Sequence, residues 1–255
     1  MSSAFGQRES SGIWVGVAGG KITRKAEADD RGAVKVLKVD KKGEPVLAED
    51  GSKQYYYRFE YDNLTGRIIS LRKSEDKWGD VVIPVLIVTL WHPTEGKINL
   101  KIKTGNRYWM GLMNVLLNVN VTKEVTFLPY DYKSKKDGKQ KTGMGLRQEG
   151  KDIPWKWTKD STDGPPKLDY VRLQDGEIYE VNGKPVWNWK PVHEWLTANV
   201  LEKVQAKVID AVAMMPIAGV QVDDPEEHQD APEPAADPMT EAFAGGPGDE
   251  DDLPF

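Results

Sequence analysis

The last residues of the chain carry the side chains best suited to a specific interaction. Four carboxylates run into a Leu-Pro-Phe sequence, and Pro254 fixes the backbone and disfavours a helix. We expect an extended acidic peptide that ends in one aromatic ring beside a terminal carboxylate. A partner with an apolar pocket ringed by Lys or Arg would take the ring and the acidic groups. The predicted partner-binding residues, called the acidic tip below, are Asp249, Glu250, Asp251, Asp252, Leu253, Pro254 and Phe255.

The acidic tip resembles closely the tip that ends bacterial single-stranded DNA-binding proteins. The resemblance covers residues 249–255 and the linker before them. In that family the tip recruits replication, recombination and repair enzymes to DNA, so the resemblance implies partners of the same class. An acidic tail that only keeps the protein soluble is the alternative.

The rest of the chain does not show the sequence of the bacterial family. Its length, its Trp content and its long C-terminal region resemble the divergent single-stranded DNA-binding proteins that bacteriophages encode, in overall plan only. No binding residue carries over from that resemblance. Candidate residues for a nucleic-acid strand must therefore come from the chemistry of the chain itself.

Charge is divided unevenly along the chain. The formal net charge is −5, yet residues 223–255 hold twelve Asp and Glu and no Lys or Arg, which leaves residues 1–222 at +7. Residues 223–248 are rich in Pro, Ala and Gly and have almost no large apolar side chains. They cannot offset the entropy of ordering, so we expect a disordered linker. A basic body joined to an acidic tail favours nucleic-acid binding more than either part alone.

Aromatic residues are abundant, and many stand next to Lys or Arg. Nine Trp, nine Tyr and five Phe could supply the flat faces that single-stranded bases stack on, although core packing is the alternative for each ring. In the strand expected over residues 55–62, the alternate aromatic residues from Tyr55 to Tyr61 would form the buried face, which leaves Tyr56 and Arg58 outward. Trp78 falls in an expected loop, where a ring is harder to bury.

Two runs of cations could contact phosphates. Residues 97–103 alternate, with apolar side chains on one face and Lys side chains on an open face. Residues 133–141 form a loop with five Lys and one Asp, which is either a solvated loop or a phosphate clamp. The predicted strand-binding residues are Tyr56, Arg58, Trp78, Lys97, Lys101, Lys103, Arg107, Lys133, Lys135, Lys136, Lys139 and Lys141.

Short alternating segments predict that residues 1–132 form a mainly β core. The Leu- and Met-rich segment 108–117 predicts one helix before the last strand of this core. The composition is typical of an OB-fold-like five-stranded barrel with an inserted short helix, and a β-sandwich is the alternative. The expected strands are 13–17, 21–25, 34–39, 55–62, 67–73, 81–91, 97–103 and 123–130, with hairpin turns at 63–66 and 93–96.

Residues 133–222 are predicted to form a basic loop and an α+β appendage packed on the core. Apolar residues at every fourth position from Leu196 to Val212 predict a helix over residues 191–212. Trp155 and Trp157 would either face bases or pin the appendage to the core. Strands are expected over 169–173 and 177–181, and residues 223–255 follow as the disordered linker and acidic tip.

Features that the sequence lacks disfavour other classes of protein. There is no Cys, and the three His stand far apart, so we expect no metal site. Phosphate-cradling Gly loops and nucleophile elbows are missing, so we expect neither an enzyme nor a cofactor. No apolar run approaches the ~20 residues of a membrane span, and the N-terminus has no signal-peptide core. We therefore expect a cytoplasmic protein of a bacterial cell or a phage-infected host.

These observations lead us to expect a sequence-nonspecific single-stranded DNA-binding protein. It would coat and protect exposed strands during replication, recombination and repair, and would recruit partners through its acidic tip. The alternative is an acidic-tailed adaptor or chaperone that mimics nucleic acid and does not bind a strand itself, and a Mg²⁺-dependent nuclease is a third hypothesis. The sequence leaves the oligomeric state open, a homo-oligomer included, as well as the preference between DNA and RNA.

Overall fold

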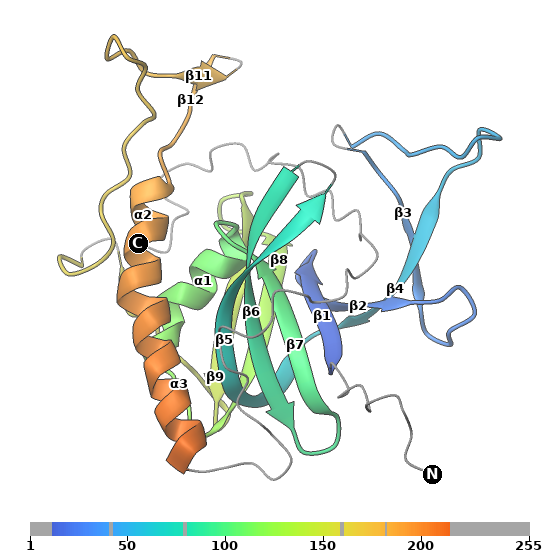
Figure 1. Cartoon of the computed structure of the whole chain (residues 1–255). Coiled ribbons are helices and arrows are strands. Elements are labelled where there is room, and N and C mark those ends of the chain that lie inside the picture. Colours follow the sequence, from blue (N-terminus) through green and yellow to red (C-terminus); the bar gives the residue numbers. More distant parts are fainter. Residues whose placement is uncertain (1–11, 41–42, 79–80, 159–160, 182, 215–255) are drawn as a thin grey trace, which may run out of the picture.

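The chain folds mainly into β-sheet, as the alternating segments predict. The computed structural model describes residues 12–40, 43–78, 81–158, 161–181 and 183–214 (Figure 1). Its strands are β1 (Ile13–Ala18), β2 (Lys21–Ala26), β3 (Val34–Leu37), β4 (Tyr55–Tyr61), β5 (Leu64–Trp78), β6 (Val81–His92), β7 (Gly96–Lys103), β8 (Glu124–Lys133), β9 (Gln140–Gln148), β10 (Lys151–Asp152), β11 (Glu180–Val181) and β12 (Lys184–Pro185). The helical elements are α1 (Arg107–Leu116), α2 (Lys190–Leu196), the π-helical segment η1 (Thr197–Leu201) and α3 (Glu202–Met214).

One large mixed sheet dominates the structure. Its ten strands follow the order β10-β9-β8-β5-β6-β7-β1-β2-β4-β3, so the sheet is open and ends at β10 and β3. Strands β5, β6 and β7 form an antiparallel meander, and β8 returns after α1 to lie beside β5. The pairing of β1 with β7 is parallel, which places the N-terminal strand next to a strand more than eighty residues later in the chain.

The hairpin predicted over residues 63–66 is wrong. Strand β4 pairs with β2 and β3, whereas β5 pairs with β6 and β8. Gly66 lies within β5 and takes no left-handed backbone conformation. A Cβ at Gly66 would stand 2.9 Å from the carbonyl oxygen of Trp91, so this glycine permits a close approach of two strands instead of a turn.

Strand β5 is longer than predicted and includes Trp78. The polar run from Ser74 to Lys77 looks like a loop in the sequence, but it pairs with the first half of β6. Trp78 is the last residue of β5, opposite Val81, and does not lie in a loop. The hairpin of β6 and β7 over residues 93–96 is confirmed.

Helix α1 packs in the core, as its apolar spacing predicts. Asn106 caps its N-terminus, because the Asn106 side chain accepts a hydrogen bond from the Trp109 amide at 2.8 Å. Gly111 faces β9 so closely that a Cβ there would stand 2.8 Å from the Met144 amide nitrogen. The buried side chains of α1 include Tyr108, Trp109, Leu112, Met113, Val115 and Leu116.

The C-terminal helix is confirmed as a run of α2, η1 and α3. The apolar residues predicted at every fourth position of this helix are all buried. A hydrogen bond also links α3 to β5, because the Arg67 guanidinium donates to the Ala211 carbonyl at 2.8 Å. In Figure 1 this helix runs along one side of the sheet. The buried positions are Leu196, Val200, Val204, Val208 and Val212.

Trp157 pins the C-terminal segment to the core, which confirms one of the two interpretations of the Trp pair. Its ring is buried and packs edge to face against the Trp195 ring, with the ring centroids 5.1 Å apart. The Asn114 side chain accepts from the Trp157 amide at 2.9 Å and donates to its carbonyl at 3.1 Å. Trp155 is 43% exposed.

The boundary predicted after Tyr132 falls inside a strand. Residues up to Lys133 belong to β8, and β8 pairs with β9 along its length, so Gln140–Gln148 extend the same sheet. Beyond β10, residues 170–187 form a small ribbon at the top of Figure 1, in which Arg172 bridges Ile178 and β11 pairs with β12. This ribbon only partly matches the strands predicted over 169–173 and 177–181.

No helix within the described ranges has the length and apolar character needed to cross a membrane.

The turn between β1 and β2 offers a matched test of close packing. Gly19 and Gly20 both adopt positive φ, at 54° and 72°. A Cβ on Gly20 would stand 2.6 Å from the Asp131 amide nitrogen, whereas a Cβ on Gly19 would meet nothing within 4 Å. Both Gly19→Ala and Gly20→Ala place a Cβ on a residue with positive φ, which costs about 1–2 kcal/mol in each variant. Only the Cβ of Gly20→Ala also clashes with β8, so we predict that Gly20→Ala lowers the free energy of unfolding by roughly 1–3 kcal/mol more than Gly19→Ala. Urea unfolding measures both values, and equal losses would contradict the packing argument.

His193 makes the folded state sensitive to acid. Its ring packs between Trp109 and Trp189, its Nε2 atom has no hydrogen-bond partner among the described atoms, and burial lowers its pKa from 6.5. The unfolded chain therefore binds more protons below that value, so the free energy of unfolding should fall as the pH drops from 6.5 through the folded pKa. Urea unfolding at a series of pH values should show a smaller loss for His193→Gln than for the unmodified chain.

Candidate nucleic-acid interface

The predicted strand-binding residues lie on several strands of the sheet, in one turn and at the start of α1. The acidic tip lies outside the described residues. Tyr56 and Arg58 lie on β4, Lys97, Lys101 and Lys103 on β7, Arg107 at the start of α1, Trp78 at the end of β5, Lys133 at the end of β8, Lys135, Lys136 and Lys139 in the following turn, and Lys141 on β9.

The Lys-rich segment is an ordered turn at the end of the β8–β9 hairpin. The Ser134 amide donates to the Lys139 carbonyl at 2.8 Å, and the Gly138 amide donates to the Ser134 carbonyl at 2.9 Å. Hydrogen bonds from Ser134 and from the Lys139 amide, with the charge of Lys141, lower the pKa of Asp137 to about 2. Asp137 is therefore ionised at neutral pH and holds the turn that presents the lysines.

Two tyrosines accompany these cations on the outer face of the hairpin. Tyr130 and Tyr132 alternate with the inward-facing Phe127 and Pro129, and their ring centroids are 6.0 Å apart. Tyr132 is 56% exposed and lies opposite Lys141. Tyr132 directly precedes Lys133 and Tyr130 lies three residues before it, but only the pairing of β8 with β9 reveals that both tyrosines share a face with Lys141. Sequence reasoning did not select them.

Gly143 gives Tyr130 its place on this face. It lies opposite Tyr130 in the ladder, and a Cβ at Gly143 would stand 2.6 Å from the Tyr130 Cζ atom, so the ring lies across the glycine. Burial raises the pKa of Tyr130, the neighbouring Tyr132 adds to that effect, and the positive charge of Arg107 opposes it. The Tyr130 hydroxyl is therefore neutral at physiological pH and close enough to Arg107 to interact with it.

Arg107 joins the hairpin to the end of β7. Its Nη1 atom donates a hydrogen bond to the Gln140 carbonyl at 3.2 Å, where β9 begins. Only three residues separate Arg107 from Lys103, the last residue of β7. We call Lys103, Arg107 and the lysines of the hairpin together the basic hairpin region.

The row of cations on β7 is less open than predicted. Ile98, Leu100 and Ile102 are buried as expected, but the opposite face is also covered in part. Asn99 is buried and accepts a hydrogen bond from the Thr89 hydroxyl at 3.0 Å, while Lys97 and Lys103 are half-buried. The strand continues inside a sheet with neighbours on both sides, and that position encloses side chains that an edge strand would leave in solvent.

Lys101 already has partners on this face. Its Nζ atom stands 2.8 Å from a carboxylate oxygen of Asp76 and 5.6 Å from the ring centroid of Trp14. Trp14 pairs with Asn99 and Trp91 pairs with Lys97, so both rings lie on the same face of the sheet as Lys101. A phosphate that reached Lys101 would have to compete with Asp76.

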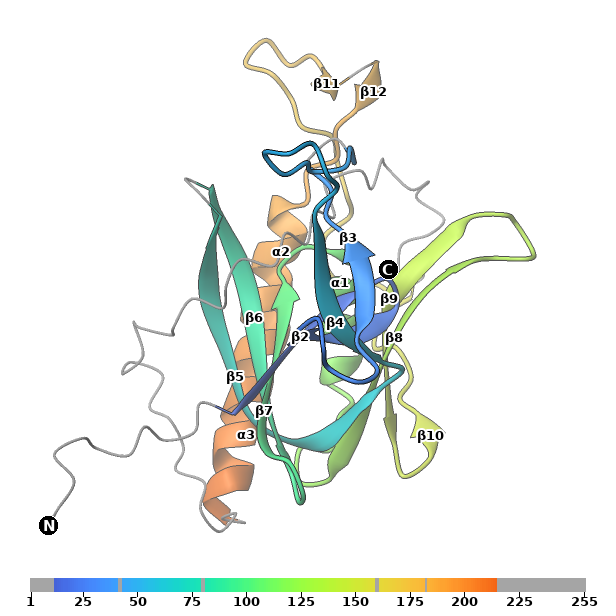
Figure 2. The same cartoon turned by 90° about the vertical axis from the view of Figure 1, so that its right-hand side faces the viewer.

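The interpretation of the two faces of β4 is wrong. Tyr55 and Tyr61, predicted to be buried, are 44% and 41% exposed, and Tyr57 and Phe59 are half-buried. Strand β4 lies in a ribbon with β2 and β3 that projects away from the body, so the described residues cover its aromatic face only in part (Figures 1 and 2).

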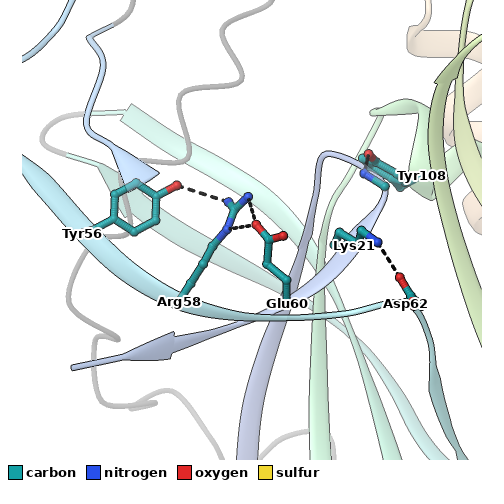
Figure 3. A network of polar contacts seen from close by, with 7 residues as sticks. Lys21, Tyr56, Arg58, Glu60, Asp62 and Tyr108 are labelled. Carbon is teal, nitrogen blue, oxygen red and sulfur yellow. Dashed lines mark hydrogen bonds and ion pairs between the residues drawn. The ribbon is translucent and has the colours of Figure 1, made fainter. Parts of the chain in front are cut away.

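Arg58, predicted to face a nucleic acid, is held by a carboxylate. Its Nε and Nη2 atoms donate to one Glu60 oxygen at 2.9 and 2.7 Å, and its Nη1 atom donates to the Tyr56 hydroxyl at 3.2 Å (Figure 3). The Arg58 side chain is only 14% exposed. This network neutralises the cation, so Tyr56 and Arg58 are weaker candidates than the hairpin residues. Positions 58 and 60 share one face of a strand, and that spacing is the sequence signal for the pair.

Within the described part of the chain, no group of three or more His, Asp or Glu residues lies close enough to hold a metal ion. Comparisons with known proteins assign no family, because no family model, curated protein or solved structure matches the chain.

Proposed function

We propose that this protein binds single-stranded DNA without sequence preference, through the basic hairpin region, and recruits partner proteins through its acidic tip. The observation that carries the proposal is the β8–β9 hairpin, an ordered projection with lysines at its turn and two tyrosines along its outer face. Cations that contact phosphates and rings that stack on bases are the two requirements for sequence-tolerant strand binding. The basic residues of the region are Lys103, Arg107, Lys133, Lys135, Lys136, Lys139 and Lys141.

The strand order supports an OB-like unit over residues 64–148. Strands β5, β6 and β7 are consecutive, and β8 lies beside β5, which gives the order β8-β5-β6-β7 of a Greek key. Strand β9 adds a fifth strand, and an OB fold is a five-stranded, partly open Greek-key barrel. This unit differs from the predicted one, because its first strand is β5 and the helix precedes its fourth strand.

The location of the cations fits the proposed unit. OB folds bind oligonucleotides on their second and third strands and on the loops between strands one and two and between strands four and five. Among the described residues, those elements are β6, β7 and the Lys-rich turn of residues 134–139. Of the two carboxylates nearby, Asp137 orders the turn and pairs with the Lys141 Nζ atom at 3.6 Å, so a phosphate would compete with it for Lys141. Asp131 accepts from Thr142 at 2.9 Å and from Gln140.

The adaptor hypothesis has one supporting observation. The ribbon of residues 170–187 exposes several large apolar side chains, which are Leu173, Ile178, Tyr179 and Val181. Such side chains on a projecting ribbon are typical of a surface that contacts another protein. An adaptor without strand binding would leave oligo-dT unbound at low salt.

The turn lysines give the most direct test of the proposed site. We predict that Lys135→Ala with Lys136→Ala weakens binding to oligo-dT and lowers the slope of log affinity against log salt by about 1.4, because each lost phosphate contact removes about 0.7. The matched control is Lys203→Ala with Lys207→Ala, two exposed lysines on α3, which lies apart from the hairpin in Figure 2. Quenching of Trp fluorescence or fluorescence anisotropy measures the affinity. The proposal fails if the unmodified chain does not bind, or if both double variants behave alike.

The acidic tip is expected to compete with DNA for the same lysines, because both ligands carry negative charge. We predict that deletion of residues 249–255 tightens oligo-dT binding at low salt and abolishes capture of a partner that recognises the tip. Phe255→Ala is the matched control, since it removes the ring, keeps the acidic run and should lose the partner without tightening DNA binding. Unchanged or weaker DNA affinity after the deletion would rule out the competition.

A further inference from the structure

Strands β2, β3 and β4 form a ribbon, called the arm below, that projects from the body next to the hairpin. Strand β4 is its middle strand and pairs with both β2 and β3. Figure 2 shows the arm rising toward the top of the view and the β8–β9 hairpin projecting to its right. Neither the proposed function nor the residues selected from the sequence account for the aromatic face of this arm.

The two faces of the arm differ in charge. One face carries the Tyr56–Arg58–Glu60 network and Lys25, so one carboxylate offsets one of its two cations. The other face, called the arm face below, holds four aromatic rings and two cations, and the ladder places no carboxylate among them. Its residues are Ile22, Arg24 and Ala26 of β2, Lys35 and Leu37 of β3, and Tyr55, Tyr57, Phe59 and Tyr61 of β4.

Each cation of the arm face lies over a ring. The Arg24 Cζ atom stands 4.9 Å from the centroid of Phe59, and the Lys35 Nζ atom stands 4.0 Å from the centroid of Tyr55. The Phe59 and Tyr61 centroids are 6.4 Å apart along the strand. The rings at the two ends, Tyr55 and Tyr61, are the most exposed of the four. A row of rings interleaved with cations provides base-stacking and phosphate contacts side by side.

The base of the arm is fixed to the hairpin. Gly20, at the turn before β2, packs against the backbone of Tyr130 and Asp131, and its amide donates a hydrogen bond to the Tyr108 hydroxyl at 2.8 Å. An ion pair between Lys21 and Asp62 links the first residue of β2 to the end of β4. The arm therefore starts beside Tyr130 and Asp131 of the β8–β9 hairpin, which places its base next to the proposed binding region.

We infer that the arm face is a second contact surface for the same single strand and lengthens the stretch of nucleotides that one protein molecule covers. The inference rests on the proposed function. On binding, Arg24 and Lys35 exchange their contacts with the rings for contacts with phosphates, and bases take their places on the exposed rings. The single-sign charge of the arm face favours a polyanion with stacking bases over an apolar protein partner.

A length series of oligo-dT separates the two surfaces. OB-type units cover about 4–16 nucleotides, so oligomers from about 4 to about 30 nucleotides range from the hairpin alone to the hairpin with the arm. We expect Lys35→Ala with Tyr55→Ala to leave the affinity for the shortest bound oligomers unchanged, to weaken the longest about tenfold and to shorten the binding-site size. The salt slope for long oligomers should fall by about 0.7 for the phosphate contact of Lys35.

Two further variants keep the test independent of folding. Lys25→Ala removes an exposed cation from the opposite face of the arm and should leave the binding-site size unchanged. Tyr55→Phe keeps the ring and should bind like the unmodified chain. An unchanged site size for the Lys35/Tyr55 variant, with normal binding by the unmodified chain, overturns the inference alone. Failure of the unmodified chain to bind any oligomer overturns the proposed function and this inference together.

Discussion

The close approach of α1 to β9 is the contact on which the other parts of the structure depend. Gly111 permits it, since any side chain at that position would strike the backbone of Met144. With the helix seated there, neighbouring residues of α1 reach four separate segments of the chain. Arg107 reaches the start of β9, Tyr108 the β1–β2 turn, Trp109 the ring of His193, and Asn114 the backbone of Trp157. A ten-residue helix thus positions the hairpin, the arm and the C-terminal helix relative to one another.

Local patterns in the sequence predict most of the elements and few of the pairings. The alternation of Ile98, Leu100 and Ile102 predicts β7 and its buried face, because both depend on one strand only. The partners of β4 and β5 depend on residues far away in the chain, and the Gly66 signal that suggests a turn reflects a close strand instead. Strand β9 contains polar residues and two glycines, so no local pattern marks it as part of the core sheet.

For the candidate site too, local features can be predicted from the sequence and contacts between distant residues cannot. The excess of lysine over residues 133–141 is visible in the sequence, and the structure presents it on an ordered turn. The partners of single residues are harder to predict, since Lys101 meets Asp76 across β6, and Tyr132 meets Lys141 only through the hairpin register. The π-helical segment η1 can be predicted in part from the sequence. Apolar residues at every fourth position overshoot the 3.6-residue turn of an α-helix, and a wider turn at Thr197–Leu201 helps keep them on one side.

The hydrogen bond between the Gly20 amide and the Tyr108 hydroxyl joins residues 88 positions apart, and this separation has a consequence for the order of folding. During synthesis, β1 and β2 leave the ribosome long before β7 and α1, their partners in the sheet and the core. Contacts of such high sequence separation form late and slow the folding of a chain, because a long loop must close first. The N-terminal strands therefore stay unpaired with the body until β7 and α1 have been synthesised. During that interval the polar and cationic side chains of β2 and β3 protect the N-terminal strands from aggregation.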